Sequence, residues 1–110
     1  MFSGLPTVTL SHVVRELVTS DRPLSGLYNV ASEPIAKYDL LVRLNEAFGL
    51  EYQIDPDPTF VIDRSLDDLA FRAATGTVRP AWDDLVRILV DDYRSLPYDT
   101  IYRRLRENDT

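Results

Sequence analysis

Apolar residues recur along most of this chain at the three- and four-residue spacing of an amphipathic helix. The pattern covers residues 10–18, 37–48, 66–74, 82–89 and 98–106, and each stretch predicts a helix, with Thr9 as the N-cap of the first. Gly49 and Gly76 suit the left-handed end of a helix because glycine has no Cβ to clash. Pro80 suits the first turn of the next helix, where its missing N–H costs nothing. The apolar positions that define the third and fourth of these faces are Leu66, Leu69, Ala70, Ala73 and Ala74, then Trp82, Leu85, Val86 and Leu89.

Three short runs have a different pattern. Residues 26–31 form a nearly continuous apolar run rich in strand-forming side chains, which is typical of a buried strand. Residues 52–54 and 60–62 are shorter runs of the same kind, separated by the loop 55–59, which contains two prolines. At 110 residues the chain is long enough for one compact domain. We therefore expect a single α+β domain, residues 1–110, with four or five helices and two or three short strands.

Composition narrows the classes of function. The net charge of −6 argues against a nucleic-acid surface and against binding to an anionic membrane, because both need clustered lysine and arginine. The absence of cysteine excludes disulfides and cysteine-based metal sites. No stretch approaches the roughly 20 apolar residues of a membrane helix, and no signal peptide is apparent at the start. A cytoplasmic location is the expectation.

Arg64 is the one side chain that we single out for binding. It precedes a helix that Asp67 and Asp68 are expected to open. The free N–H groups at a helix start favour a phosphate, and a guanidinium beside them adds two parallel hydrogen bonds. The same residues allow an alternative, an ion pair between Arg64 and Asp63 or Asp67. Trp82 also has two interpretations, stacking on a base or sugar and packing in the core.

Other catalytic patterns are weak. His12 is the only histidine and falls on the edge of the first apolar face, so a surface role is favoured over a catalytic one. The paired carboxylates, such as Asp83 and Asp84, point about 100° apart on a helix and do not share a site. Two of the three pairs fall in first turns, where negative charge complements the helix dipole. We assign no catalytic residue and no metal site.

The chain also resembles a known family. Residues 26–31, G-L-Y-N-V-A, and 35–50 are similar to a strand and the following helix of extended short-chain dehydrogenases/reductases, although Ala36 stands where serine is common. The likeness continues toward the C-terminal end, where Arg79 stands at a position that is often proline. It is greatest for the dTDP-4-dehydrorhamnose reductase branch. The matching positions there are Arg64, Ser65, Leu66, Asp67, Arg72, Gly76, Pro80 and Trp82.

This resemblance implies the substrate-binding C-terminal lobe of an NAD(P)-dependent nucleotide-sugar reductase or epimerase. In that family an arginine in the region of Arg64 contacts the nucleotide diphosphate of a dTDP- or UDP-linked sugar. The glycine-rich turn that holds the cofactor is missing, since no two of the four glycines are close together. The catalytic Tyr–Lys pair is also missing, because Lys37 is the only lysine and residue 33 is Glu33. We therefore expect no cofactor in this chain, no activity alone, and a Rossmann domain outside it.

Two other functions stay open. The alternative is a non-enzymatic interaction or dimerisation module derived from such a lobe. Self-association of the lobe is expected, with Leu10, Val14 and Leu17 as part of the contacting face. A weaker hypothesis is a small enzyme of another class that uses His12. Binding of dTDP or UDP by the chain distinguishes the first hypothesis from the second.

Overall fold

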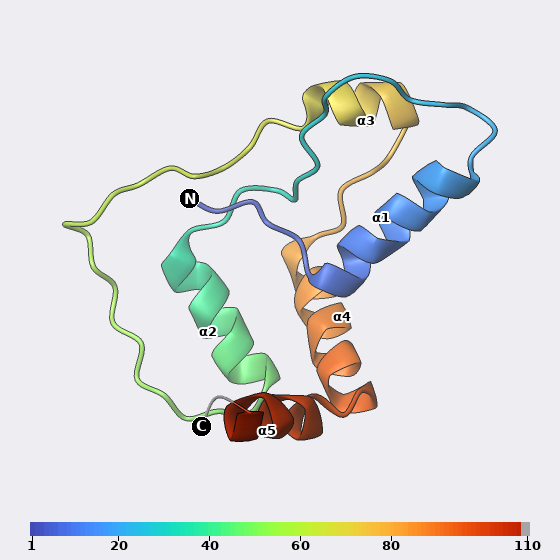
Figure 1. The fold of residues 1–110 in the computed structure, drawn as a ribbon. Coiled ribbons are helices and arrows are strands. Elements are labelled where there is room, and N and C mark those ends of the chain that lie inside the picture. Colours follow the sequence, from blue (N-terminus) through green and yellow to red (C-terminus); the bar gives the residue numbers. More distant parts are fainter. Residues whose placement is uncertain (109–110) are drawn as a thin grey trace.

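The computed structural model describes residues 1–108 and has five helices. They are α1 (Thr7–Thr19), α2 (Lys37–Ala47), α3 (Leu69–Thr75), α4 (Trp82–Ser95) and α5 (Tyr98–Asn108). α1 and α2 both pack against α4, and α5 crosses below α2 and α4 (Figure 1). α3 lies apart from these four, at the opposite end of the molecule (Figure 1). None of the helices within residues 1–108 is long and apolar enough to cross a membrane.

The core follows the apolar stripe of α4. Leu85 is fully buried, and Val86 and Val90 are almost fully buried on the same face. The indole Nε1 of Trp82 donates a hydrogen bond of 2.6 Å to the carbonyl of Glu33, which fastens the start of α4 to the segment before α2. Of the predicted stripe, Leu85 and Val86 are confirmed as buried, whereas Trp82 and Leu89 are partly exposed and Val90 was not among the predicted positions. Trp82 contributes to packing at the edge of this face.

The N-terminal segment is held between two extended segments. Phe2 exchanges two backbone hydrogen bonds with Ile35, of 2.8 and 2.7 Å, in an antiparallel bridge. On its other side, the Met1 carbonyl accepts a bond of 2.9 Å from the N–H of Arg64, and the amino group of Met1 donates to the carbonyl of Ile62. Residues distant in sequence are therefore brought side by side, but over only one or two pairs on each side.

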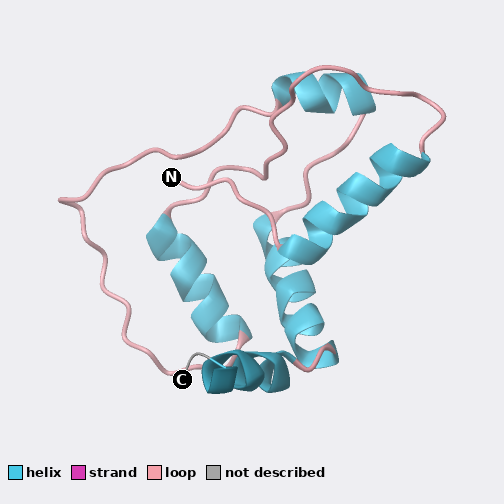
Figure 2. Cartoon of the chain, in the orientation of Figure 1, coloured by secondary structure: helices cyan, strands magenta, loops and turns pink. Residues whose placement is uncertain are grey.

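The predicted α+β fold class is wrong. Within residues 1–108 no segment forms a strand, and Figure 2 shows helices joined by loops. Residues 26–31, 52–54 and 60–62 are strand-like in composition but have no ladder of backbone partners. A strand exists only through pairing, and a single bridge is too short to make one. The sequence reports the side-chain preference of a segment, not whether a partner segment lies beside it.

The described chain is open. Its radius of gyration is 16.8 Å, against about 13 Å expected for a compact domain of this length. It exposes 8891 Å² to solvent, against about 6,200 Å² for a compact monomer of 12.6 kDa. The segment between α2 and α3 extends away from the helices before it returns to α3 (Figure 1). On it, Tyr52, Phe60 and Val61 are all strongly exposed.

Several local predictions need correction. α3 buries Phe71 and not the predicted leucine and alanine face, of which Leu69 is 60% exposed. The reason is that Phe71, the largest apolar side chain of α3, packs edge-on against Tyr28, with ring centroids 6.3 Å apart. α1 begins at Thr7 after Pro6, so Thr9 lies inside the helix and does not cap it.

The last helix is attached through aromatic rings. Tyr98 stacks on Tyr93 with ring centroids 5.8 Å apart, and Tyr93 meets Phe48 of the segment after α2 edge-on at 5.5 Å. The side chains predicted to face inward on α5 are instead about half exposed, at 46% for Ile101 and 55% for Leu105. α5 is therefore held at its start, by tyrosines, and not by an apolar stripe.

Candidate functional site

Arg64 lies where the long exposed segment rejoins the body of the protein. Its backbone N–H bonds to Met1, and two residues later the N–H of Leu66 donates to Oγ of Ser3 at 2.7 Å. Ser3 is 3% exposed, so this anchor is buried. The backbone on both sides of Arg64 is thus fixed by the N-terminal segment, although Arg64 belongs to no helix or strand.

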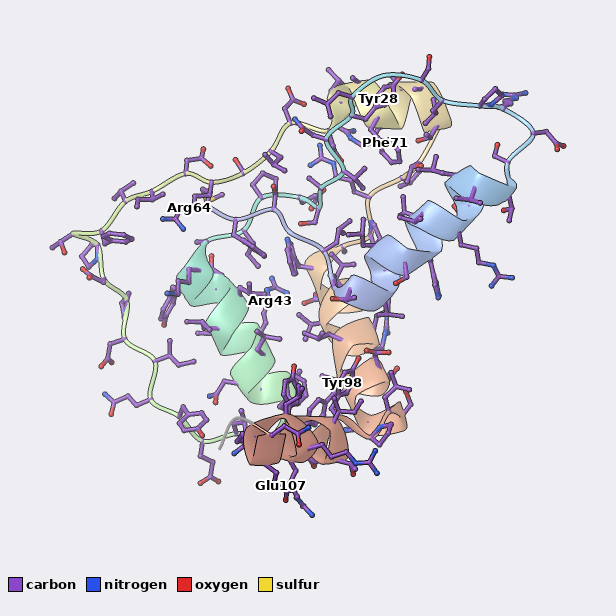
Figure 3. All side chains as sticks on the ribbon, viewed as in Figure 1. Tyr28, Arg43, Arg64, Phe71, Tyr98 and Glu107 are labelled. Carbon is purple, nitrogen blue, oxygen red and sulfur yellow. The ribbon has the colours of Figure 1, made fainter. Side chains whose placement is uncertain are left out.

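The guanidinium of Arg64 is exposed and points away from α3 (Figure 3). Its two expected ion-pair partners are engaged elsewhere. Oδ1 of Asp63 accepts hydrogen bonds from the hydroxyl and the N–H of Ser65, and these bonds hold the pKa of the Asp63 carboxyl below its ordinary value. Oδ1 of Asp67 accepts from the N–H of Leu69 at 2.9 Å. Within residues 1–108, the Arg64 side chain has no ion pair.

The helix beside Arg64 starts later than predicted. α3 begins at Leu69, with Asp68 as its N-cap residue, and it is only seven residues long. Arg64 is therefore separated from the helix start by a turn in which the carboxylate of Asp67 accepts the N–H of Leu69. A phosphate at Arg64 would depend mainly on the guanidinium itself, because the field of a helix falls off within its first turn.

The structure adds a charged cluster that the sequence pattern did not reveal. Asp68 is 3% exposed, and its Oδ1 lies 3.0 Å from Nε of Arg72 and 3.5 Å from Nη2 of Arg79. The spacing of Asp68 and Arg72 is that of an i, i+4 pair on a helix, so this ion pair could have been predicted from the sequence. The contact of Asp68 with Arg79 could not, because Arg79 lies on the segment after α3 and no local pattern relates the two positions.

A shallow groove of about 450 Å³ runs between α2 and α4. Arg43 of α2, labelled in Figure 3, forms an ion pair with Asp83 of α4 across this groove. Arg87 forms an ion pair with Asp84, and both residues belong to α4. The groove carries charges of both signs, many of them already paired. It offers no selectivity for an anion or a cation.

The remaining candidates carry no site. His12 is exposed on α1, with no carboxylate or hydroxyl partner among the described residues. Among residues 1–108 there is no group of three or more histidine, aspartate or glutamate side chains that would hold a metal ion. Among the paired carboxylates, Asp92 accepts a hydrogen bond from the Tyr98 hydroxyl at 2.7 Å. Asp68, Asp83 and Asp84 form ion pairs with arginines, so the acids with observed contacts pair with cations or anchor a tyrosine and do not form an acid–base pair with one another.

Comparison of the chain with protein-family models, with curated proteins and with solved structures finds no match. The likeness to extended short-chain reductases therefore stays a prediction, based on the matching residues that occur in the same order along the chain.

Proposed function

We propose that this chain is the substrate-binding lobe of an NAD(P)-dependent nucleotide-sugar reductase or epimerase, similar to the dTDP-4-dehydrorhamnose reductase branch. The proposal assigns Arg64 to the diphosphate of a dTDP- or UDP-linked sugar. It assigns the cofactor and the catalytic residues to a Rossmann domain outside this chain, and it includes a cytoplasmic location. The chain alone is then inactive.

The observation that carries the proposal is the state of Arg64. Its guanidinium is exposed and without an ion pair within residues 1–108, while the backbone around it is held by hydrogen bonds to the N-terminal segment. A charged group on a fixed backbone is presented to ligands at a smaller entropic cost than one on a mobile loop. The open shape of the chain also supports the proposal, because it leaves large apolar side chains exposed. A lobe that closes over a substrate needs such an apolar surface to pack on its partner domain.

The test is the binding of dTDP and UDP to the parent chain and to Arg64 variants, measured by chemical-shift titration. Arg64→Ala should weaken binding by about tenfold to a hundredfold, since a charge-assisted bidentate bond contributes about 1.5–3 kcal/mol. Arg64→Lys should restore only part of the affinity, because an ammonium lacks the two-pronged geometry. The matched control is Arg104→Ala, which removes another exposed arginine side chain, from α5.

Thermal melts of the same variants separate a binding role from a structural one. The melting temperature of Arg64→Ala should equal that of the parent. A variant that melts lower and still binds dTDP or UDP as well as the parent would show that Arg64 has a structural role.

The second candidate function is a non-enzymatic interaction module. It is favoured by the exposed apolar residues of α1, where Val14 is 51% and Val18 is 79% exposed. Self-association without any affinity for dTDP or UDP would select this function over the first.

A further inference from the structure

The cluster around Asp68 is unbalanced in charge. One carboxylate faces two guanidiniums, and both approach the same oxygen atom, Oδ1. Arginine stays protonated in proteins, so the cluster keeps one positive charge in excess. The side chains of Arg72 and Arg79 are 30% and 23% exposed, which places this charge at the boundary between solvent and interior. An excess charge in such a position is screened less than one on the open surface.

The hydrogen-bond donors of the two arginines are also largely unused. Arg72 donates from Nε to Asp68, and within residues 1–108 its two Nη groups have no acceptor. Arg79 lies in ion-pair range of Asp68 but donates no hydrogen bond to any described residue. Among the described residues, neither arginine has a buried side-chain nitrogen without a partner, so the unused donors reach solvent.

We infer that Arg72 and Arg79 bind a phosphate group of single negative charge on the solvent side of Asp68. A single negative charge neutralises the cluster, whereas a doubly charged phosphate would reverse its sign beside a buried carboxylate. The tetrahedral oxygens of a phosphate can accept from both guanidiniums at once, which a second carboxylate does less well. The identity of the ligand rests on the proposed function, since each phosphate of a sugar-linked nucleoside diphosphate carries one negative charge.

The experiment uses the parent chain and dimethyl phosphate, which has one negative charge and neither base nor sugar. Nitrogen–proton spectra of the arginine Nε–H groups are recorded during the titration, with sodium chloride at equal ionic strength as the reference. Saturable shifts are expected for Arg72 and Arg79 and not for Arg87, an exposed arginine paired on α4. Shifts of Arg72 and Arg79 no larger than those in sodium chloride would overturn the inference without any variant.

Variants then test the two side chains. Arg79→Lys keeps the charge but removes the fork, so the affinity for dimethyl phosphate should fall by about tenfold or more. Arg87→Lys is the matched control and should bind as the parent does. If Arg79→Lys binds as well as the parent, the inference is wrong; if it fails to fold, the titration of the parent chain decides alone.

A parallel titration with a UDP-linked sugar, whose two phosphates each carry one negative charge, separates this inference from the assignment of Arg64. Shifts at Arg72 and Arg79 with none at Arg64 would uphold the cluster and refute Arg64 as the diphosphate contact. Shifts at Arg64 alone would do the reverse. The failure of one proposal is therefore visible independently of the other.

Discussion

Leu85 gives the sharpest test of how this protein is held together. It is fully buried on α4, the helix against which α1 and α2 both pack. Replacing leucine by alanine removes three carbon atoms, which at about 0.8 kcal/mol for each buried methylene is a loss of about 2.4 kcal/mol. The cavity left behind adds to this, and measured leucine-to-alanine changes in cores span about 2–5 kcal/mol. Because the core of this open chain is small and has room to relax, we expect Leu85→Ala to cost about 2.5–3.5 kcal/mol.

The assay is urea unfolding followed by circular dichroism, with the free energy of unfolding obtained by linear extrapolation. Leu27→Ala is the matched control: the chemical change is identical, but Leu27 is 98% exposed, so its effect should stay within about 0.5 kcal/mol. Equal losses in the two variants, or no loss in Leu85→Ala, would refute the placement of the core on α4.

Three further predictions follow from the same structure. Asp68→Asn should lower the free energy of unfolding by about 1–3 kcal/mol, which is less than for a fully buried pair because both arginines reach solvent. Asp84→Asn, in the exposed pair with Arg87, should lower it by less than about 1 kcal/mol, and urea unfolding of both variants checks the difference. Hydrogen bonds to Asp99 and Asp92 raise the pKa of Tyr93 and Tyr98 above the ordinary value of 10.0, so their stabilising contribution is complete below that pH and is lost as the pH rises through the folded-state pKa. A pH titration of tyrosinate absorbance and helicity should show α5 detaching in that range, and Tyr98→Phe should reduce this sensitivity while Tyr52→Phe, on the exposed loop, does not. The parent chain should bind no NADPH in a fluorescence titration, and saturable binding at micromolar concentration would contradict the assignment of the cofactor to another domain.

The helices could be predicted from the sequence because their determinants are local. Leu85 and Val86 have helical spacing and are buried as predicted, although Val90 and not the predicted Leu89 completes the buried face. Gly76 ends α3 with a positive φ of 69°, a conformation that side chains with a Cβ rarely adopt. Pro97 separates α4 from α5, since proline lacks the N–H that would continue the helix. In each case a residue and its near neighbours contain the whole physical reason.

The tertiary structure decided which segments meet. Residues 26–31 have the composition of a strand, but they pair through their backbone with no other described segment, so they remain extended loop. Phe71, not the alanines beside it, faces inward because Tyr28, far away in sequence, lies against it.

The candidate sites also depend partly on local sequence and partly on tertiary contacts. Arg64 was identified from its local pattern together with the family resemblance, whereas its fixed backbone depends on Met1 and Ser3 at the start of the chain. The burial of Asp68 between Arg72 and Arg79 depends on the path of the chain after α3, and pairings of that kind follow from the balance of all the contacts in the folded state, which no local pattern encodes.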